Sequence, residues 1–143
     1  MYILDTNHVI ALENGTATAQ KLIQKWDTVS IEPKVITSII SYKEQIAGCL
    51  ASINRKKITS DQSVKSYKRL QLLLRFYCGM TVLEFDADAE KIFQNLRKVH
   101  PRTSANDLKI ASIALANDAV LLTQNIRDFE SIERLSVEDW IAL

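Results

Sequence analysis

The sequence has 143 residues, of which 47% are hydrophobic and 24% charged, and its formal net charge is +1. This composition is typical of a globular protein, and the near-zero charge excludes binding to nucleic acid through a global field, so that any such affinity must come from a local patch or a metal. The length predicts one domain over residues 1–143. Since no segment reads as a secretory signal or approaches the length of a membrane span, we expect a cytoplasmic protein that does not act at a membrane.

The chain begins with a short apolar run that ends in a carboxylate. Residues 2–4 show no polar alternation, which is typical of a strand buried on both faces, and Asp5 follows directly. In an open parallel sheet, ligands bind beyond the carboxyl ends of the strands. Asp5 is therefore predicted to lie at the mouth of a site. The alternative is that Asp5 or Asn7 merely caps a helix that begins near His8.

Apolar spacing and turn residues predict that short strands and helices alternate along the chain. This alternation predicts an α/β fold in which a parallel sheet has helices on both faces. The expected helices cover residues 8–13, 16–26, 38–52, 61–77, 87–99 and about 104–115. Their expected caps include Asn7, Asp61 and Asp86. The expected strands cover residues 2–4, 29–31 with a resumption at 35–37, 81–85, 120–123 and 135–137.

Glu44 interrupts the apolar stripe of the helix predicted over residues 38–52. It follows Ile40 by four residues and precedes Ala47 by three, so it falls on or beside the stripe. A carboxylate in that place needs a hydrogen-bond donor, a cation or a metal. The alternative is that Ser41 and Glu44 form a capping box and the helix starts later. The residues expected on the buried side are Ile39, Ile40, Ile46, Ala47 and Leu50.

A second acidic candidate, Asp107, lies in the first turn of a helix that is apolar nearly all round. The positive end of the helix dipole favours a carboxylate there, although capping by the Ser104-x-x-Asp107 pattern would also explain it. Three further polar residues, Thr123, Asn125 and Asp128, follow the strand predicted over residues 120–123.

Carboxylates gathered in one crevice repel each other unless a cation neutralises them. Oxygen ligands without His or Cys favour Mg2+, or alternatively Mn2+, over zinc. Such ions lower the pKa of a bound water and stabilise the charge of an in-line attack on a phosphodiester. The acidic residues therefore point to nuclease chemistry.

One segment of the chain is strongly basic. Between Arg55 and Arg75 only Asp61 opposes the positive charges. Such a run is usually a solvated helix face, but beside a site that handles RNA its residues become candidates for phosphate contacts. These candidates are Arg55, Lys56, Lys57, Lys65, Lys68 and Arg69.

Four segments in order resemble the motifs of PIN-domain ribonucleases. Within that superfamily, the length of the chain and the ending LSVEDW are most similar to VapC, the toxin of type II toxin–antitoxin pairs. The resemblance implies a three-layer α/β/α sandwich with a mainly parallel sheet, an RNA substrate, an antitoxin partner and a homodimer. The segments are Ile3–Asn7, Ile39–Gly48, Asn106–Ala114 and Leu121–Phe129.

By position, the resemblance implies that Asp5, Glu44 and Asp107 form an acidic triad around Mg2+. Thr6 would support the first acid through its hydroxyl group, and Thr123 would shape the floor of the site.

The fourth acidic position departs from part of the family, because Asn125 stands where other members have Asp. Its carbonyl oxygen can ligate or orient a water, but it brings no charge. Asp128 is the alternative source of that charge, and whether one or two metal ions bind stays open.

Two rival functions remain open at this stage. A PIN fold that has lost turnover could act as a binding module for RNA or an antitoxin-like partner, and the neutral Asn125 favours this alternative. A phospho-acceptor receiver domain also gathers acids around Mg2+. However, neither the strand at 35–37 nor the strand at 81–85 offers a convincing Asp to accept the phosphoryl group. A similar fold alone is not evidence for a function.

Overall fold

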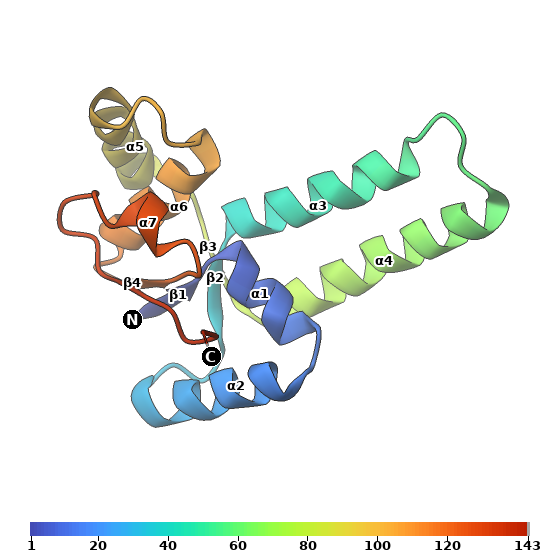
Figure 1. The fold of residues 1–143 in the computed structure, drawn as a ribbon, viewed down its shortest axis with the longest axis horizontal. Helices are drawn as coiled ribbons and strands as arrows, with labels where there is room; N and C mark the ends of the chain where they lie inside the picture. The colour runs from blue at the N-terminus through green and yellow to red at the C-terminus, as the bar shows by residue number, and fades with distance from the viewer. Residues whose placement is uncertain (143) are drawn as a thin grey trace.

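The structure is a computed structural model that describes residues 1–142. Within these residues, five strands form one parallel sheet in the order β3-β2-β1-β4-β5. The predicted α/β class with a parallel sheet and helices on both faces is confirmed (Figure 1). The strands are β1 (Tyr2–Leu4), β2 (Ile36–Ser38), β3 (Thr81–Leu83), β4 (Val120–Leu122) and β5 (Val137–Glu138).

The order of the strands divides the helices between the two faces. Because crossovers between parallel strands are right-handed, the helices that connect β1 to β2 and β2 to β3 lie on one face, and those that follow β3 and β4 lie on the other. Figure 1 shows α1 and α2 on the side opposite α5, α6 and α7. The helices are α1 (Thr6–Glu13), α2 (Ala17–Val29), α3 (Ile39–Ile53), α4 (Ser60–Cys78), α5 (Ala87–Val99), α6 (Ala105–Ala116) and α7 (Ile126–Phe129).

Strands β1 and β4 are neighbours in the middle of the sheet, and the chain leaves them toward opposite faces. This is the topological switch point of the fold, where open α/β sheets form a crevice at the carboxyl ends of the strands. The residues that follow β1 and β4, Asp5 and Thr123, therefore meet at this crevice.

The core is centred on β1, β4 and α6. Both strands carry adjacent side chains without solvent access, Ile3 and Leu4 on β1 and Leu121 and Leu122 on β4. A strand covered on both faces requires this continuous apolar pattern. The expectation that α6 is buried on nearly all sides is confirmed by Leu108, Ile110, Ala111, Ile113 and Ala114.

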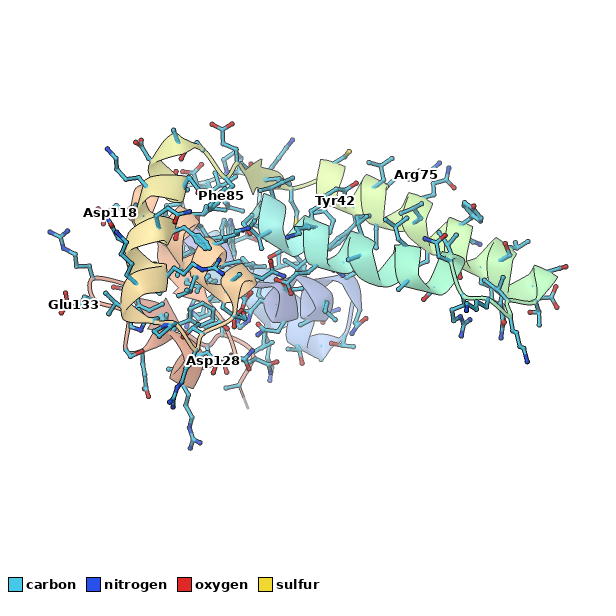
Figure 2. The ribbon with its side chains drawn as sticks, turned by 90° about the horizontal axis from the view of Figure 1, so that it is seen from above. Tyr42, Arg75, Phe85, Asp118, Asp128 and Glu133 are labelled. Atoms are coloured by element: carbon cyan, nitrogen blue, oxygen red, sulfur yellow. The ribbon has the colours of Figure 1, made fainter. Side chains whose placement is uncertain are left out.

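Helices α3 and α4 form a long antiparallel arm that projects from the rest of the molecule (Figures 1 and 2). The prediction that Ile39, Ala47 and Leu50 are buried is wrong: Ile39 is 38% exposed, Leu50 is 44% exposed, and Ala47 is also exposed. Where the arm projects beyond the body, α3 and α4 lie side by side, so in the described residues the outward faces of both helices are left to solvent (Figure 1). Residues 1–142 contain no helix with the length and hydropathy of a membrane span.

Two predicted caps, Asn7 and Asp61, are wrong in detail, whereas the helix predicted from residue 38 is confirmed against its alternative. The N-cap of α1 is Asp5, not Asn7, because the Asp5 carboxylate accepts the Thr6 N–H at 2.7 Å. Helix α3 begins after Ser38, whose hydroxyl accepts the Ser41 N–H at 3.3 Å, so a capping box starting at Ser41 is excluded. Helix α4 is capped by Thr59 in a capping box with Gln62, and the predicted cap Asp61 lies in the first turn.

The strand predicted over residues 29–31 is also wrong. Val29 is the last residue of α2, and Ile31 is 98% exposed in the connection to β2. A run of three residues cannot distinguish the end of an amphipathic helix from a strand by its period alone. The resumption predicted at residues 35–37 corresponds to β2, displaced by one residue.

Candidate metal site at the switch point of the sheet

Asp5 is built into the junction between β1 and β4. Its N–H donates to the Leu122 carbonyl at 2.9 Å, which continues the pairing of the two strands. Its carboxylate accepts the Thr6 N–H at 2.7 Å and the Thr123 hydroxyl at 2.8 Å. Only 4% of the residue is exposed. Asp5 is therefore both the cap of α1 and a buried carboxylate at the crevice. Its capping of the helix is compatible with a role in the site.

Burial is the main influence on the Asp5 carboxyl group and raises its pKa. The hydrogen bonds from Thr123 and Thr6 act in the opposite direction because they stabilise the anion, whereas repulsion by Asp107 and Asp128 adds to the rise. The net result is a pKa above the usual value of 3.8. The negative charge of Asp5 is therefore incompletely compensated.

Glu44 extends the acidic site from α3. The residue is half-buried, and the pKa of its carboxyl group is raised by burial and by repulsion from Asp5 and Asp107, while the nearby Thr6 hydroxyl and the charge of Lys43 oppose the rise. The Thr6 hydroxyl donates its one hydrogen to Ser41 Oγ at 3.1 Å. The predicted supporting residue Thr6, the first residue of α1, thus connects α1 to α3 beside Glu44.

Asp107 reaches the site from the first turn of α6. Its N–H donates to the Ser104 hydroxyl at 3.1 Å, so Ser104 caps the helix as the pattern predicted. Burial raises the pKa of the Asp107 carboxyl group, the hydrogen bond with Ser104 lowers it, and repulsion by Asp128 raises it again. The carboxylate therefore shares the electrostatic environment of Asp5.

The fold brings three carboxylates from separate parts of the chain into one repelling group, and each has a raised pKa. Among residues 1–142, none of the three forms an ion pair with a basic side chain. Nor do any three Asp, Glu, His or Cys side chains in that range lie close enough together to hold a metal ion as they stand. The donor set nevertheless fits a hard divalent cation, because it consists of oxygens whose negative charges lack a counter-charge.

Thr123 forms the floor of the crevice and is completely buried. Besides donating to Asp5, its Oγ accepts from Asn7 Nδ2 at 3.4 Å and from the Asn125 N–H at 3.1 Å. Asn125 lies at the N-cap position of α7, and Asp128 lies within α7. The charge of Asp128 acts on both Asp5 and Asp107.

Two residues behind the site, Asn7 and His8, were not predicted to take part in it, and Asn7 was expected only as a helix cap. Asn7 Oδ1 accepts from the Gln124 N–H at 3.3 Å and lies 2.8 Å from His8 Nδ1. His8 is completely buried, and its Nε2 accepts the Trp140 N–H at 3.1 Å, an arrangement that assigns the proton to Nδ1. Burial lowers the pKa of His8 to about 4. The Asp-Thr-Asn triplet could have drawn attention to Asn7, but no local pattern connects His8 with Trp140.

The basic residues of the arm do not form one surface. Lys65 and Arg69 line a groove of about 490 Å³ beside Thr6 and Glu44. Lys68 lines a different pocket with Tyr42 and Tyr67, and it therefore faces another side of the arm. Figure 2 shows side chains along both flanks of the arm, with Tyr42 labelled on α3 and Arg75 on α4. The remaining basic candidates are exposed in the connection between α3 and α4, namely Arg55, Lys56 and Lys57.

The sequence matches the PIN domain family over residues 2–135. The chain belongs to the PIN domain family. Among curated PIN-domain relatives, it is 28% identical over 142 residues to Ribonuclease VapC1 of Haemophilus influenzae strain R2866, with 98% of both chains covered. It is 31% identical over 140 residues to Ribonuclease VapC of Rickettsia bellii, with 94% of this chain and 92% of that protein covered.

The PIN fold is matched by solved structures as well. The structure of VapBC-1 from nontypeable Haemophilus influenzae superposes with a TM-score of 0.70 and 26% identity, covering 99% of this chain and 98% of that chain. The predicted resemblance to PIN-domain VapC proteins and the predicted α/β/α architecture are therefore confirmed.

Proposed function

We propose that this protein is a metal-dependent endoribonuclease and the toxin of a toxin–antitoxin pair. The observation that carries the proposal is the group of mutually repelling carboxylates at the N-cap of α1, on α3 and on α6, in a fold whose relatives are named ribonucleases. Enzymes of this kind need acidic oxygens to hold a divalent cation beside a phosphodiester. The function predicted from the sequence is therefore retained.

Asp5, Glu44 and Asp107 are the residues that would hold the metal ion. Oxygen-only donors favour Mg2+, with Mn2+ as the alternative. When bound, the ion would lower the pKa of a water molecule and stabilise the charge that develops on the phosphate. The side chains that surround the triad have supporting roles: Thr123 holds the Asp5 carboxylate by a hydrogen bond of 2.8 Å, and the Thr6 hydroxyl near Glu44 favours the ionised form of that carboxyl group.

For the fourth acidic position, we favour Asp128 over Asn125. The charge of Asp128 already acts on two members of the triad. The Asn125 N–H is bonded to Thr123 Oγ, which gives this residue a part in shaping the turn into α7. In this proposal Asn125 acts through that turn or by orienting a water, and Asp128 supplies the negative charge.

RNA would approach the acidic site along the groove beside Glu44. Lys65 and Arg69 line this groove, so they are the best placed of the basic candidates to contact phosphates close to the scissile bond. The exposed residues Arg55, Lys56 and Lys57 lie in the connection at the end of the arm and would contact more distant parts of the RNA. Lys68, on the other flank, is the weakest candidate.

The partner of this toxin would be a cognate antitoxin. Several structures with this fold are titled as VapBC complexes, and one is titled a toxin–antitoxin complex from Klebsiella pneumoniae. We also propose that residues 1–143 form a single domain, that the toxin is a homodimer, and that it acts in the cytoplasm without a membrane partner.

The deciding experiment is cleavage of total cellular RNA by the toxin purified free of antitoxin. We expect cleavage with Mg2+, none with a chelator, and a loss of more than about a hundredfold for Asp107→Asn, which is beyond the range for residues that only support a ligand. Without metal, Asp107→Asn should unfold at the same or a higher temperature than the wild type, because the raised pKa means that the ionised carboxylate destabilises the folded state at neutral pH.

Two outcomes would contradict the proposal. If the Asp107→Asn variant still cleaved RNA, Asp107 would not be a metal ligand. A folded wild-type toxin that binds RNA or an antitoxin but cleaves nothing at any concentration of Mg2+ or Mn2+ would favour the alternative of a PIN-fold binding module.

A further inference from the structure

Four polar side chains on three helices are linked behind the acidic site. The Tyr77 hydroxyl on α4 donates to Gln45 Oε1 on α3, and Gln45 Nε2 donates to Glu13 Oε2 at the end of α1, at 3.1 Å. The other oxygen of Glu13 accepts from Arg69 on α4. We call Glu13, Gln45, Arg69 and Tyr77 the three-helix network. None of these residues belongs to the acidic site.

The three-helix network is well shielded from water on the side of Tyr77. Tyr77 is 3% exposed and packs against Tyr42, with the ring centroids 5.0 Å apart. The Glu13 side chain is 16% exposed, whereas the Arg69 side chain is 44% exposed at the rim of the groove. Hydrogen bonds with little access to water hold their geometry better than exposed ones, because water cannot replace either partner. The link from Tyr77 through Gln45 to Glu13 is therefore its rigid part.

Gln45 is the neighbour of Glu44 in the sequence, and its bonds determine how α3 is turned toward α1. Ser41 and Gln45 are one helical turn apart and lie on the same face of α3. Ser41 accepts from Thr6 at the start of α1, and Gln45 donates to Glu13 at its end. Glu44 lies between these two attachments, so the rotation of α3 at Glu44 is fixed from both sides.

This attachment acts against electrostatic repulsion. Asp5 directly precedes α1, and the charges of Asp5 and Asp107 repel Glu44. Without the link between α1 and α3, the arm could turn so that Glu44 moves away from the other carboxylates. The link holds the carboxylates near one another before a cation binds, and a site organised in advance binds its ligand more tightly.

We propose that Glu13, Gln45 and Tyr77 are positioning residues that hold Glu44 in the acidic site and thereby set the affinity of the toxin for divalent metal. The inference rests on the proposed function, because it takes Glu44 to be a metal ligand. Arg69 completes the charge balance of Glu13 at the rim of the groove.

The test is calorimetric titration of Mn2+ into the full-length toxin, free of antitoxin, for Gln45→Leu and Tyr77→Phe. We expect the Kd for Mn2+ to rise about tenfold for Gln45→Leu, the lower end of the range for residues that orient metal ligands, and about threefold for Tyr77→Phe, which is one step further from Glu44. The rise in unfolding temperature that Mn2+ produces should shrink in the same order. In cleavage assays at subsaturating Mn2+, kcat should fall while KM for RNA stays unchanged.

The matched control is Gln71→Leu, which removes an exposed glutamine of α4 that is not hydrogen-bonded to any member of the network. This variant should keep the wild-type Kd for Mn2+. If Gln45→Leu does not fold, Tyr77→Phe decides the matter, because it removes a single hydroxyl group.

A Kd within twofold of the wild type for Tyr77→Phe and for folded Gln45→Leu would overturn the inference while leaving the proposed function intact. A wild-type toxin that binds no Mn2+ would instead overturn the proposed metal site, and the positioning role with it.

Discussion

The crevice between β1 and β4 and the arm formed by α3 and α4 meet at Glu44, but they differ in how their residues are used. At the crevice, Asp5 and Thr123 have almost no contact with solvent, and all their side-chain oxygens have hydrogen-bond partners. On the arm, Val64 is 68% exposed and Leu74 is 52% exposed. The apolar residues of the body are therefore buried and stabilise the fold. On the arm, many apolar residues stay exposed and are available for contact with other molecules.

The two regions also differ in charge. The crevice gathers carboxylates, while the arm and its connecting loop carry all seven basic residues from Arg55 to Arg75, which only Asp61 opposes. RNA is repelled by uncompensated acids and attracted by lysine and arginine. In a metal-dependent ribonuclease, the division is useful: the crevice is suited to the reaction, and the arm is suited to holding the substrate beside it.

The largest expected difference between the two regions is in stability. Leu108→Ala on α6 should lower the free energy of unfolding by about 3 kcal/mol, because it opens a cavity in the core. Leu74→Ala on the arm should change it by less than about 0.5 kcal/mol, since half of the side chain is already in water. Urea unfolding at pH 7 measures both. Equal losses would show that the arm is part of the stabilising core.

A smaller effect concerns pH and also belongs to the body. The pKa of buried His8 is lowered from 6.5 to about 4, so the unfolded chain binds a proton more readily than the folded protein between these values. The stability contributed by neutral His8 is present above pH 6.5 and is lost as the pH falls toward 4. Between pH 7 and pH 5 this loss should reach about 2 kcal/mol.

The measurement for His8 is urea unfolding at pH 7 and pH 5 for the wild type and His8→Gln. The variant should lose less stability over this interval than the wild type, because it has no imidazole to protonate. The carboxylates with raised pKa act in the opposite direction in both proteins, and their effect cancels in the comparison. Parallel pH dependences would contradict the role given to His8.

The smallest expected effect is on the arm. Lys65→Ala should weaken RNA binding several-fold and reduce the slope of log affinity against log salt by about 0.7, the value for one phosphate contact to a single strand. Lys91→Ala on α5, which belongs to the opposite face of the sheet, is the matched control and should leave both quantities unchanged. Filter binding of RNA to a cleavage-deficient Asp107→Asn toxin at several salt concentrations measures the difference. If the slope of log affinity against log salt is unchanged for Lys65→Ala, RNA does not bind along the groove that Lys65 lines.

The body could be predicted from the sequence because its patterns are local. Residues 2–4 form an unbroken apolar run, α6 is apolar nearly all round, and Asp86 caps α5 as predicted. The carboxylates at the ends of strands and helices could be found for the same reason. Their assembly into one site was expected from the order of four motifs, and the order of the strands accounts for it physically.

The arm was predicted less well, because exposure depends on what packs against a helix. The apolar residues of α3 have the spacing of a buried stripe, but Ile39 and Leu50 lie where no other element covers them. The three-helix network has no signal in the sequence, since Glu13, Gln45 and Tyr77 are 32 residues apart in each step. Contacts of this kind follow from tertiary structure alone.

Asp5 has both a structural role and a place in the acidic site, whereas the helix that carries Asp107 is capped by another residue, Ser104. The Asp5 carboxylate is the acceptor for the Thr6 N–H and for the buried Thr123 hydroxyl, so its replacement would leave donors at the centre of the sheet without partners. In a genetic selection for cells that survive the unopposed toxin, changes at Asp5 should therefore yield little protein, and changes at Asp107 should yield abundant, folded and harmless protein. For preparing the toxin without its antitoxin, Asp107 is accordingly the better position to alter.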